Sequence, residues 1–210
     1  MYINIHSHTL EHPKENHLSI YNLQLQSSAT PPQTAKFSAG IHPWYIPENP
    51  NQAIETLKAL TLKSNMVAIG ECGLDKLCQT PFELQKELFK AQIRVSEESK
   101  KPLIIHCVKS YNEIVELKKE TNPTQTWIIH GFRGKPEVVT MLTKAGIVLS
   151  IGDKFNHEAI KSMAMENLLI ENDESLTPIE EIYQNIADTR NISLSELQKE
   201  VEKTYKKIFQ

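Results

Sequence analysis

Short apolar or β-branched runs recur along the chain and alternate with segments whose apolar residues fall at helical spacing. Most of the runs are too short for a helix and are typical of buried strands. They predict eight strands, at about residues 2–6, 18–25, 36–41, 66–71, 102–107, 126–130, 146–151 and 167–171. Helical patterns follow the later strands, at 51–64, 80–100, 110–121, 135–145 and 155–165.

Three short sequences indicate where helices begin. Thr80-Pro81-Phe82-Glu83 has the capping-box pattern, with proline at the first helical position. The pattern returns at residues 177–180 and 193–196, and predicts two C-terminal helices. The last of these is amphipathic. We expect its apolar face to pack on the domain, and this face is formed by Leu194, Leu197, Val201, Tyr205 and Ile208.

Alternation of strands and helices favours an α/β fold, with a parallel sheet covered by helices. Eight strands suggest a closed (β/α)8 TIM barrel, and 210 residues is near the lower size limit of that fold. Segments 9–17 and 26–35 lack a helical pattern, so we predict a trimmed barrel whose early crossover helices are shortened or absent. A doubly wound open sheet is the main alternative. No linker divides the chain, which predicts a single domain over residues 1–210.

Composition narrows the class of protein. A hydrophobic fraction of 40% and a charged fraction of 23% are ordinary for a globular protein, and no apolar run has the length of a membrane span. The first residues lack a signal-peptide pattern, so we expect a cytoplasmic protein with no membrane partner and no obligate protein partner. A net charge of -3 argues against wrapping of long duplex nucleic acid. We predict that Cys72, Cys78 and Cys107 are reduced core residues.

Five of the predicted strands end in imidazoles or carboxylates. These residues are His6, His8, Glu71, His106, His130 and Asp173. In a parallel barrel the carboxyl ends of all strands meet on one face, so residues distant in sequence would converge there. His6 and His8 are two residues apart on a strand, so both side chains point to the same side and can share one centre.

Four histidines and two carboxylates in one place would repel one another if charged, and would be poorly solvated if neutral. Two divalent cations resolve both difficulties. Imidazole suits zinc and other transition metals, whereas carboxylates suit magnesium and manganese and can bridge two ions. We therefore predict two divalent ions (Mg, Mn or Zn) with Glu71 as the bridge. The other histidines, His12, His17, His42 and His157, lie in loops or at helix starts and are predicted to have surface or supporting roles.

These motifs, in this order, resemble the TatD family of metal-dependent deoxyribonucleases, within the wider amidohydrolase-like barrel enzymes. The stretches that carry the resemblance are NIHSH (4–8), GIHPW (40–44), AIGECGLD (68–75), KPLIIHC (101–107), WIIHGFRG (127–134), LSIG (149–152) and IEND (170–173). The resemblance implies a (β/α)8 barrel and a typically Mg-dependent nuclease, often exonucleolytic on DNA. It also implies that His6 and His8 bind one metal, that Glu71 bridges, and that Asp173 ligates the first metal and handles the proton of the attacking water.

The resemblance further implies that His106 and His130 serve the second metal. Three positions depart from the family pattern. Asn4 stands where relatives commonly have Asp, so a supporting anion is absent. Arg133 lies in a segment that usually reads Cys-Phe-Ser-Gly, and Lys109 replaces a frequent Arg, which exchanges a bidentate fork for a point charge. These departures bear on substrate choice.

We predict hydrolysis of a phosphodiester by water that two metals activate, with Asp173 and Glu71 as catalytic residues and with Lys109 and Arg133 holding the phosphate. The expected substrate is a DNA strand end or a short oligonucleotide. One alternative is an amidohydrolase-type enzyme that acts on an amide, lactone or small ester, although such enzymes often carry a bridging lysine where this chain has Glu71. A second alternative is a barrel without catalysis that serves as a binding module.

The sequence raises three smaller expectations around these motifs. Trp44 and Phe132, each beside a site motif, would either stack on a nucleobase or pack at the barrel rim. Gly70 and Gly73 would allow close backbone approach next to Glu71. Asp75 is a candidate to anchor the loop that follows its strand.

Overall fold

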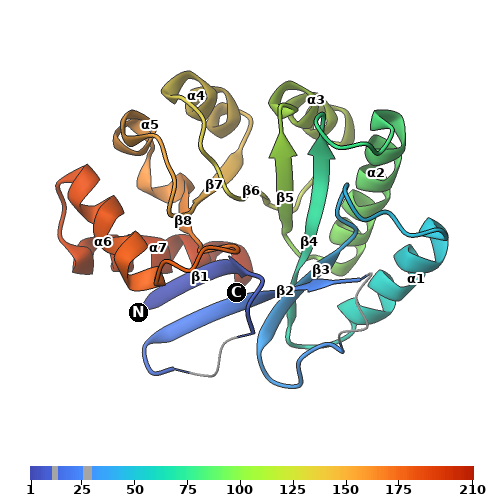
Figure 1. Ribbon diagram of the computed structural model, residues 1–210, viewed down its shortest axis with the longest axis horizontal. Helices are drawn as coiled ribbons and strands as arrows, with labels where there is room; N and C mark the ends of the chain where they lie inside the picture. The colour runs from blue at the N-terminus through green and yellow to red at the C-terminus, as the bar shows by residue number, and fades with distance from the viewer. Residues whose placement is uncertain (11–13, 26–29) are drawn as a thin grey trace. The chain divides into compact units, whose positions relative to one another are not determined.

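The computed structural model describes residues 1–10, 14–25 and 30–210, and Figure 1 shows its elements. The strands are β1 (Tyr2–Ser7), β2 (His17–Gln24), β3 (Lys36–Gly40), β4 (Met66–Asp75), β5 (Leu103–Val108), β6 (Trp127–Ile129), β7 (Ile147–Ile151) and β8 (Leu168–Ile170). The helices are α1 (Pro50–Thr61), α2 (Phe82–Ser99), α3 (Tyr111–Thr121), α4 (Pro136–Lys144), α5 (His157–Ser162), the 3-10 helix η1 (Met165–Asn167), α6 (Ile179–Arg190) and α7 (Leu194–Phe209). All the predicted strands and helices are present. His12 lies outside the described residues.

The strands hydrogen-bond in the order in which they occur in the sequence, from β1 to β8. The pairs β1–β2, β3–β4, β4–β5 and β7–β8 are parallel. Helices connect the later strands, so the predicted α/β class is confirmed. Between β1 and β2 the described residues 8–10 and 14–16 contain no helix, and neither do residues 30–35 before β3. Within the described part of the chain, the early crossovers are therefore loops, as predicted.

The chain divides into two compact units, which we describe separately. The first unit contains Met1–Tyr21 and Ile129–Gln210, and the second contains Asn22–Ile128. Strands β2 and β6 each contribute residues to both units. The single domain over residues 1–210 stays a prediction.

In the first unit, helix α7 packs against β1 and β8 through one face. Leu197, Val201 and Tyr205 on this face are buried, which confirms the amphipathic pattern that the sequence predicted. Helix α6 is fixed to β1 by a buried tyrosine. The hydroxyl of Tyr183 donates to the carbonyl of Ile3 and accepts from its amide, at 3.0 Å in both cases. One side chain thus satisfies two backbone groups that burial would otherwise leave unpaired.

Replacement of Tyr183 by phenylalanine is expected to lower the free energy of unfolding by about 1–3 kcal/mol, because it leaves two buried backbone groups unpaired. Urea denaturation of the two proteins measures the difference. Tyr205→Phe is the matched control, since the hydroxyl of Tyr205 is buried without a hydrogen-bond partner among the described residues. An equal loss of stability in the two variants would contradict this account of the Tyr183 contact.

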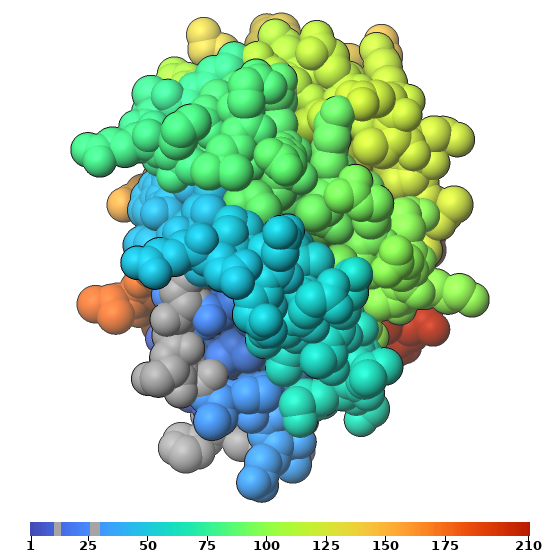
Figure 2. Space-filling view, turned by 90° about the vertical axis from the view of Figure 1, so that its right-hand side faces the viewer, coloured from blue at the N-terminus to red at the C-terminus, as the bar shows by residue number. Residues whose placement is uncertain are grey.

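In the second unit, helix α2 packs on β4, and helices α1 and α2 lie side by side on the face shown in Figure 2. The buried side of α2 includes Leu88, Phe89 and Ile93. Trp127, which is fully buried, contacts Phe89 with ring centroids 5.4 Å apart. This aromatic pair anchors α2 on the sheet of its unit.

The three cysteines are free, as predicted, and two of them lie in the core of the second unit. Cys72 and Cys107 are buried, and Cys78 is half-buried. Burial raises the pKa of the Cys107 thiol to about 12, so this side chain stays protonated at neutral pH. It therefore behaves as a small apolar residue.

One of the three predicted capping boxes forms its side-chain bond. The hydroxyl of Ser193 accepts a hydrogen bond from the amide of Glu196, 3.1 Å away, at the start of α7. The prediction is wrong for α2 and α6, whose N-cap residues are Pro81 and Pro178 and have no side-chain cap. Because proline takes the N-cap place in both helices, the threonine before it lies outside the helix. Thr80 instead donates to the carbonyl of Pro43 at 2.7 Å.

Candidate metal-binding sites

In the first unit, the segment after β8 pairs with the end of β1. Ser7 and Asp173 form a parallel bridge. The amide of Asp173 donates to the carbonyl of His6 at 3.0 Å, and the amide of His8 donates to the carbonyl of Asp173 at 3.1 Å. These backbone hydrogen bonds therefore hold both histidines and the aspartate next to one another, independently of any side-chain contact.

The side chains of these residues converge. The Nε2 atoms of His6 and His8 lie 3.5 and 3.4 Å from the same carboxylate oxygen, Oδ1 of Asp173. The ring of His130 lies 4.3 Å from that of His6, centroid to centroid. One ligand atom each from His6, His130 and Asp173 lies within 4.8 Å of the other two. Imidazole nitrogens with one carboxylate oxygen at this spacing suit a divalent cation.

The environment of Asp173 keeps its carboxylate ionised. Burial acts to raise its pKa, but hydrogen bonds from His6 and His8 and the attraction of His130 outweigh burial. The pKa of Asp173 is therefore held well below its usual range. An ionised carboxylate only accepts hydrogen bonds and is the form that binds a metal.

Glu171, which the sequence analysis did not select, orients His130. Its side chain is fully buried, and its Oε1 accepts from the amide of Gly131 at 2.6 Å and lies 3.2 Å from Nδ1 of His130. A proton on Nδ1 leaves Nε2 of His130 as the ligand atom. The other oxygen, Oε2, is buried without a hydrogen-bond partner among the described residues, which fits a cation nearby. The signal in the sequence was the acid directly after the apolar run of β8.

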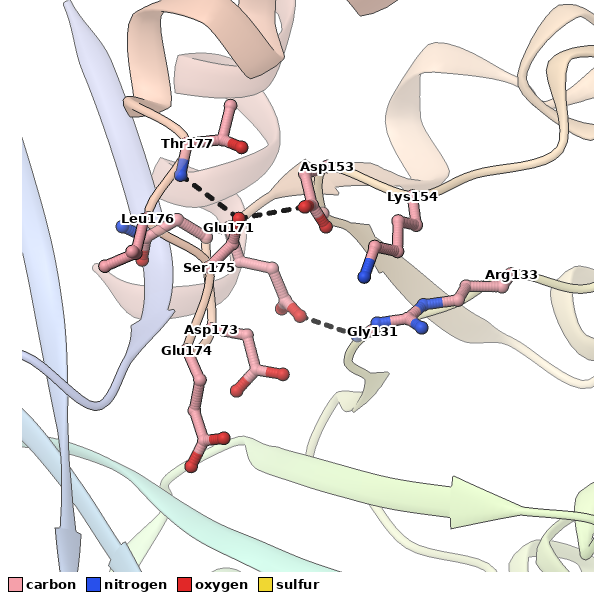
Figure 3. Close-up of a pocket in the computed structure, with 12 residues that line it drawn as sticks. Gly131, Arg133, Asp153, Lys154, Glu171, Asp173, Glu174, Ser175, Leu176 and Thr177 are labelled. Carbon is pink, nitrogen blue, oxygen red and sulfur yellow. Dashed lines mark hydrogen bonds between the residues drawn. The ribbon is translucent and has the colours of Figure 1, made fainter.

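A pocket of about 480 Å³ adjoins Asp173 in the first unit. Figure 3 shows Arg133 and Lys154 on the side opposite Asp173. The hydroxyl of Ser175 donates to the carboxylate of Asp153 at 2.9 Å and so ties together two of the segments that line this pocket. Arg133, which the sequence placed near the site, therefore lines the same pocket as Asp173, and Lys154 is a second cation there that the sequence analysis missed.

Asn4 is also part of the first unit's arrangement. Its side-chain amide donates to the side chain of Asn172 at 2.8 Å, and its oxygen accepts from the amide of Asn172 at 3.2 Å. These two bonds hold the residue that precedes Asp173. The neutral amide of Asn4 thus positions Asn172 through two hydrogen bonds. Members of the family that the sequence resembles commonly have an anion at this position.

In the second unit, a set of ligands surrounds Glu71. Its side chain is only 6% exposed, and its Oε1 lies 3.0 Å from Nε2 of His42 and 2.9 Å from Nδ1 of His106. Ligand atoms of the three residues lie within 4.8 Å of one another. Asn22 holds both the backbone and the carboxylate of Glu71, because its side-chain oxygen accepts from the amide of Glu71 at 3.0 Å and its side-chain amide donates to Oε2 at 3.4 Å. This set is a second candidate for a divalent cation.

His42 was predicted to have a surface or supporting role. The surface position is wrong, because His42 is only 8% exposed and lies 3.0 Å from Glu71, whereas a supporting role stays a prediction. The reason is that the chain after β3 turns inward at residues 41–43, all of which are buried. His106 also belongs to this set, whereas His130 lies beside His6 in the first unit.

Asp75 anchors the loop after β4, as predicted. Its carboxylate accepts from the amide of Leu77 at 2.7 Å and from the indole of Trp44 at 2.6 Å, and it lies 3.3 Å from Nε2 of His106. Burial acts to raise the pKa of Asp75, but these hydrogen bonds outweigh it and lower the pKa. Asp75 is thus an ionised residue that fixes both the loop and the ring of His106.

Glycines bring β4 against β5 at Glu71. A Cβ atom at Gly70 would lie 2.4 Å from the carbonyl oxygen of Ile104, and one at Gly73 would lie 2.1 Å from that of His106. Their φ angles are +143° and +141°, which L side chains rarely adopt. The close approach predicted at both glycines is therefore confirmed. Lys109 lies just beyond β5, where its side chain is exposed.

This chain matches a known protein family over most of its length. A model of the family described as TatD related DNase matches residues 14–210. A protein of Buchnera aphidicola, described as an uncharacterized metal-dependent hydrolase, is 36% identical over an alignment 152 residues long, which covers 68% of this chain and 57% of the relative. The 3'-5' ssDNA/RNA exonuclease TatD of Pantoea ananatis is 27% identical over 82% of this chain and 76% of its own length. This chain thus spans little more than half of the Buchnera relative.

Solved structures establish the fold. The TatD homologue YJJV of Escherichia coli aligns with a TM-score of 0.81 at 18% identity, over 91% of this chain and 86% of that one. A TatD family hydrolase of Entamoeba histolytica aligns with a TM-score of 0.74 at 18% identity, over 99% and 97% of the two chains. This likeness confirms the predicted (β/α)8 barrel class and excludes the doubly wound sheet.

None of the helices in the described residues combines the length and the hydropathy needed to cross a membrane.

Together, the family match, the relatives and the fold give one assignment. The chain belongs to the TatD-related DNase family of metal-dependent hydrolases.

Proposed function

We propose that this chain is a metal-dependent phosphodiesterase that removes nucleotides from the end of single-stranded DNA or of a short oligonucleotide. The observation that supports it most is the pair of compact imidazole–carboxylate sets, one in each unit, which contain all six residues selected from strand ends. The description of the Pantoea relative as an exonuclease of single-stranded DNA and RNA agrees with this substrate class.

We propose that each set holds a divalent cation. In the first unit the ligands would be His6, His8 and Asp173, with His130 beside them. In the second unit the ligands would be Glu71, His106 and His42. A bound divalent cation supplies Lewis acidity, which lowers the pKa of water and neutralises charge on a phosphate.

The protein's own groups have distinct tasks in this proposal. Asp173, ionised because His6 and His8 donate to it, orients the attacking water and receives its proton. Arg133 and Lys154 bind phosphate oxygens in the pocket that adjoins Asp173. Lys109 is proposed as a further phosphate contact, next to the second unit's set.

The test is hydrolysis of a single-stranded oligodeoxynucleotide labelled at one end, with magnesium, manganese or zinc added separately. We expect stepwise shortening with at least one metal and none in excess chelator. A matched panel of amide and lactone substrates covers the amidohydrolase alternative. Cleavage of that panel without any cleavage of DNA or RNA would overturn the proposal.

Replacement of Glu171 by glutamine is expected to weaken metal affinity by about 10- to 100-fold, because glutamine can still accept from the amide of Gly131 but lacks the charge that orients His130. Manganese titration by calorimetry measures the change. Glu158→Gln is the control, since it removes the same charge from the same unit at a position where the side chain is 71% exposed and pairs with Lys161. An equal effect of the two substitutions would show that Glu171 acts only through total charge.

A further inference from the structure

The second unit exposes a tryptophan beside its metal-binding set. Of the two tryptophans in the chain, Trp127 is fully buried, whereas Trp44 is 52% exposed. Phe132, the other aromatic residue that the sequence offered as a stacking platform, is 1% exposed. Because a stacking residue must present its ring to solvent, burial excludes Phe132 as a stacking residue. The exposure of Trp44 is compatible with that role.

The ring of Trp44 is held in place. Its indole N–H donates to the carboxylate of Asp75 at 2.6 Å, and its backbone amide donates to Nδ1 of His42 at 3.0 Å. The ring lies 5.0 Å from that of His42 and 5.4 Å from that of His106, centroid to centroid. An aromatic face fixed in this way loses little entropy when a flat ligand stacks on it.

Trp44 lines a cavity of about 450 Å³, which we call the Trp44 pocket. Its other walls include Leu77, Thr80 and Val108. Leu77 is 71% exposed and adds apolar surface to the pocket. The pocket volume is within the roughly 300–1,000 Å³ typical of small-ligand sites.

The loop that forms these walls is built around one buried residue, Gln85. Its Nε2 donates to the carbonyls of Asp75 and Thr80 at 3.0 and 2.8 Å, and its Oε1 accepts from the amide of Asp75 at 2.8 Å. Thr80 in turn donates to the carbonyl of Pro43, next to Trp44. These hydrogen bonds fix the walls of the pocket, so the pocket is preformed.

We propose that the Trp44 pocket binds the base of a nucleotide whose phosphodiester is hydrolysed at the adjoining metal-binding set. The inference rests on the proposed function and adds the part of the substrate that is recognised. Asp75 links the two places, because its carboxylate accepts from Trp44 and lies 3.3 Å from His106. Stacking is tolerant of sequence, since every base has a π face, so the pocket favours nucleotides without selecting one base.

Intrinsic fluorescence tests binding without using activity. In excess chelator, a short single-stranded oligodeoxynucleotide is expected to quench the tryptophan emission of the full chain to saturation. Trp44→Phe removes the exposed fluorophore and leaves Trp127, whose burial shields it, so the quench is expected to vanish. An equal quench in wild type and Trp44→Phe would overturn the inference.

Kinetics test whether stacking serves catalysis. Two oligonucleotides are compared that differ only in whether the terminal nucleotide carries a base or is abasic. The base is expected to raise kcat/KM about 10- to 100-fold, as stacking energies imply, and Trp44→Ala is expected to remove that preference. Trp44→Phe keeps an aromatic face and is expected to retain part of it. Leu62→Ala, at an 88% exposed position away from the pocket, is the control.

The outcomes separate this inference from the proposed function. Cleavage of both oligonucleotides at equal rates overturns the Trp44 pocket and leaves the phosphodiesterase intact. Saturable quenching without any cleavage supports the pocket and overturns the phosphodiesterase. Quenching by an aromatic amide and not by oligonucleotides would overturn the inference and favour an amide ligand.

Discussion

Replacement of Glu71 by glutamine is expected to lower kcat/KM on single-stranded DNA by more than about a thousandfold, or about 4 kcal/mol of transition-state stabilisation. Glutamine has the same shape, and its backbone amide can still donate to Asn22. It lacks the negative charge that faces His42 and His106 at 3.0 and 2.9 Å. Steady-state kinetics measure the loss, and elemental analysis is expected to find less bound metal.

Glu55→Gln is the control for this experiment, because Glu55 lies on α1 with its side chain 65% exposed and pairs with Lys58 in the same helix. Circular dichroism of both variants checks that the fold is kept. If Glu71→Gln kept both the rate and the metal content of the wild type, the ligand role proposed for Glu71 would be wrong.

Replacement of Gly73 by alanine is expected to cause the largest loss of stability among single substitutions near the site. The added Cβ would meet the backbone oxygen of His106 at 2.1 Å, and the φ angle of +141° is strained for any residue with a side chain. Backbone on both sides of the contact leaves no flexible group to move. We expect the melting temperature to fall by roughly 10 °C or more, which thermal unfolding measures.

Gly152→Ala provides the comparison for this variant. A Cβ there would have its nearest neighbour, the carbonyl oxygen of Glu171, at 3.9 Å, which is ordinary contact. The melting temperature of Gly152→Ala is expected to stay near that of the wild type. Should Gly73→Ala reach too low a yield for melting, its soluble fraction beside that of Gly152→Ala gives the same comparison, and equal values would refute the steric account.

Most of the fold could be predicted from the sequence, because local properties of the sequence mark the strands. Each apolar run ended where periodicity changed, so all eight strands could be placed to within a few residues. The helix starts were less accurate. At Thr80 the local pattern was that of a cap, but a tertiary acceptor, the carbonyl of Pro43, took the hydroxyl instead. A competition of this kind cannot be read from a short window of sequence.

The residues of the candidate site likewise fall into two groups, those that local signals in the sequence identify and those that only the structure identifies. His6 and His8 were recognisable because two-residue spacing on a strand is a local signal, and strand-end positions marked Glu71 and Asp173. The residues that contact this set could not be recognised from such local signals. Glu171 follows an apolar run as the selected acids do, but its contact with His130, 41 positions away, appears only in the structure, and so does the burial of His42 against Glu71. Their role depends on packing that a single sequence does not display.

The bridge between Ser7 and Asp173 has a consequence for biosynthesis. Asn4 and Asn172, which hold the same junction, are 168 positions apart in the chain. Contacts of such long sequence separation form late, because a long loop must close first. A ribosome that has translated the early strands has therefore made His6 and His8 without Asp173. A growing chain would acquire this cation-binding set, and any hydrolytic activity that depends on it, only after residue 173 has left the exit tunnel.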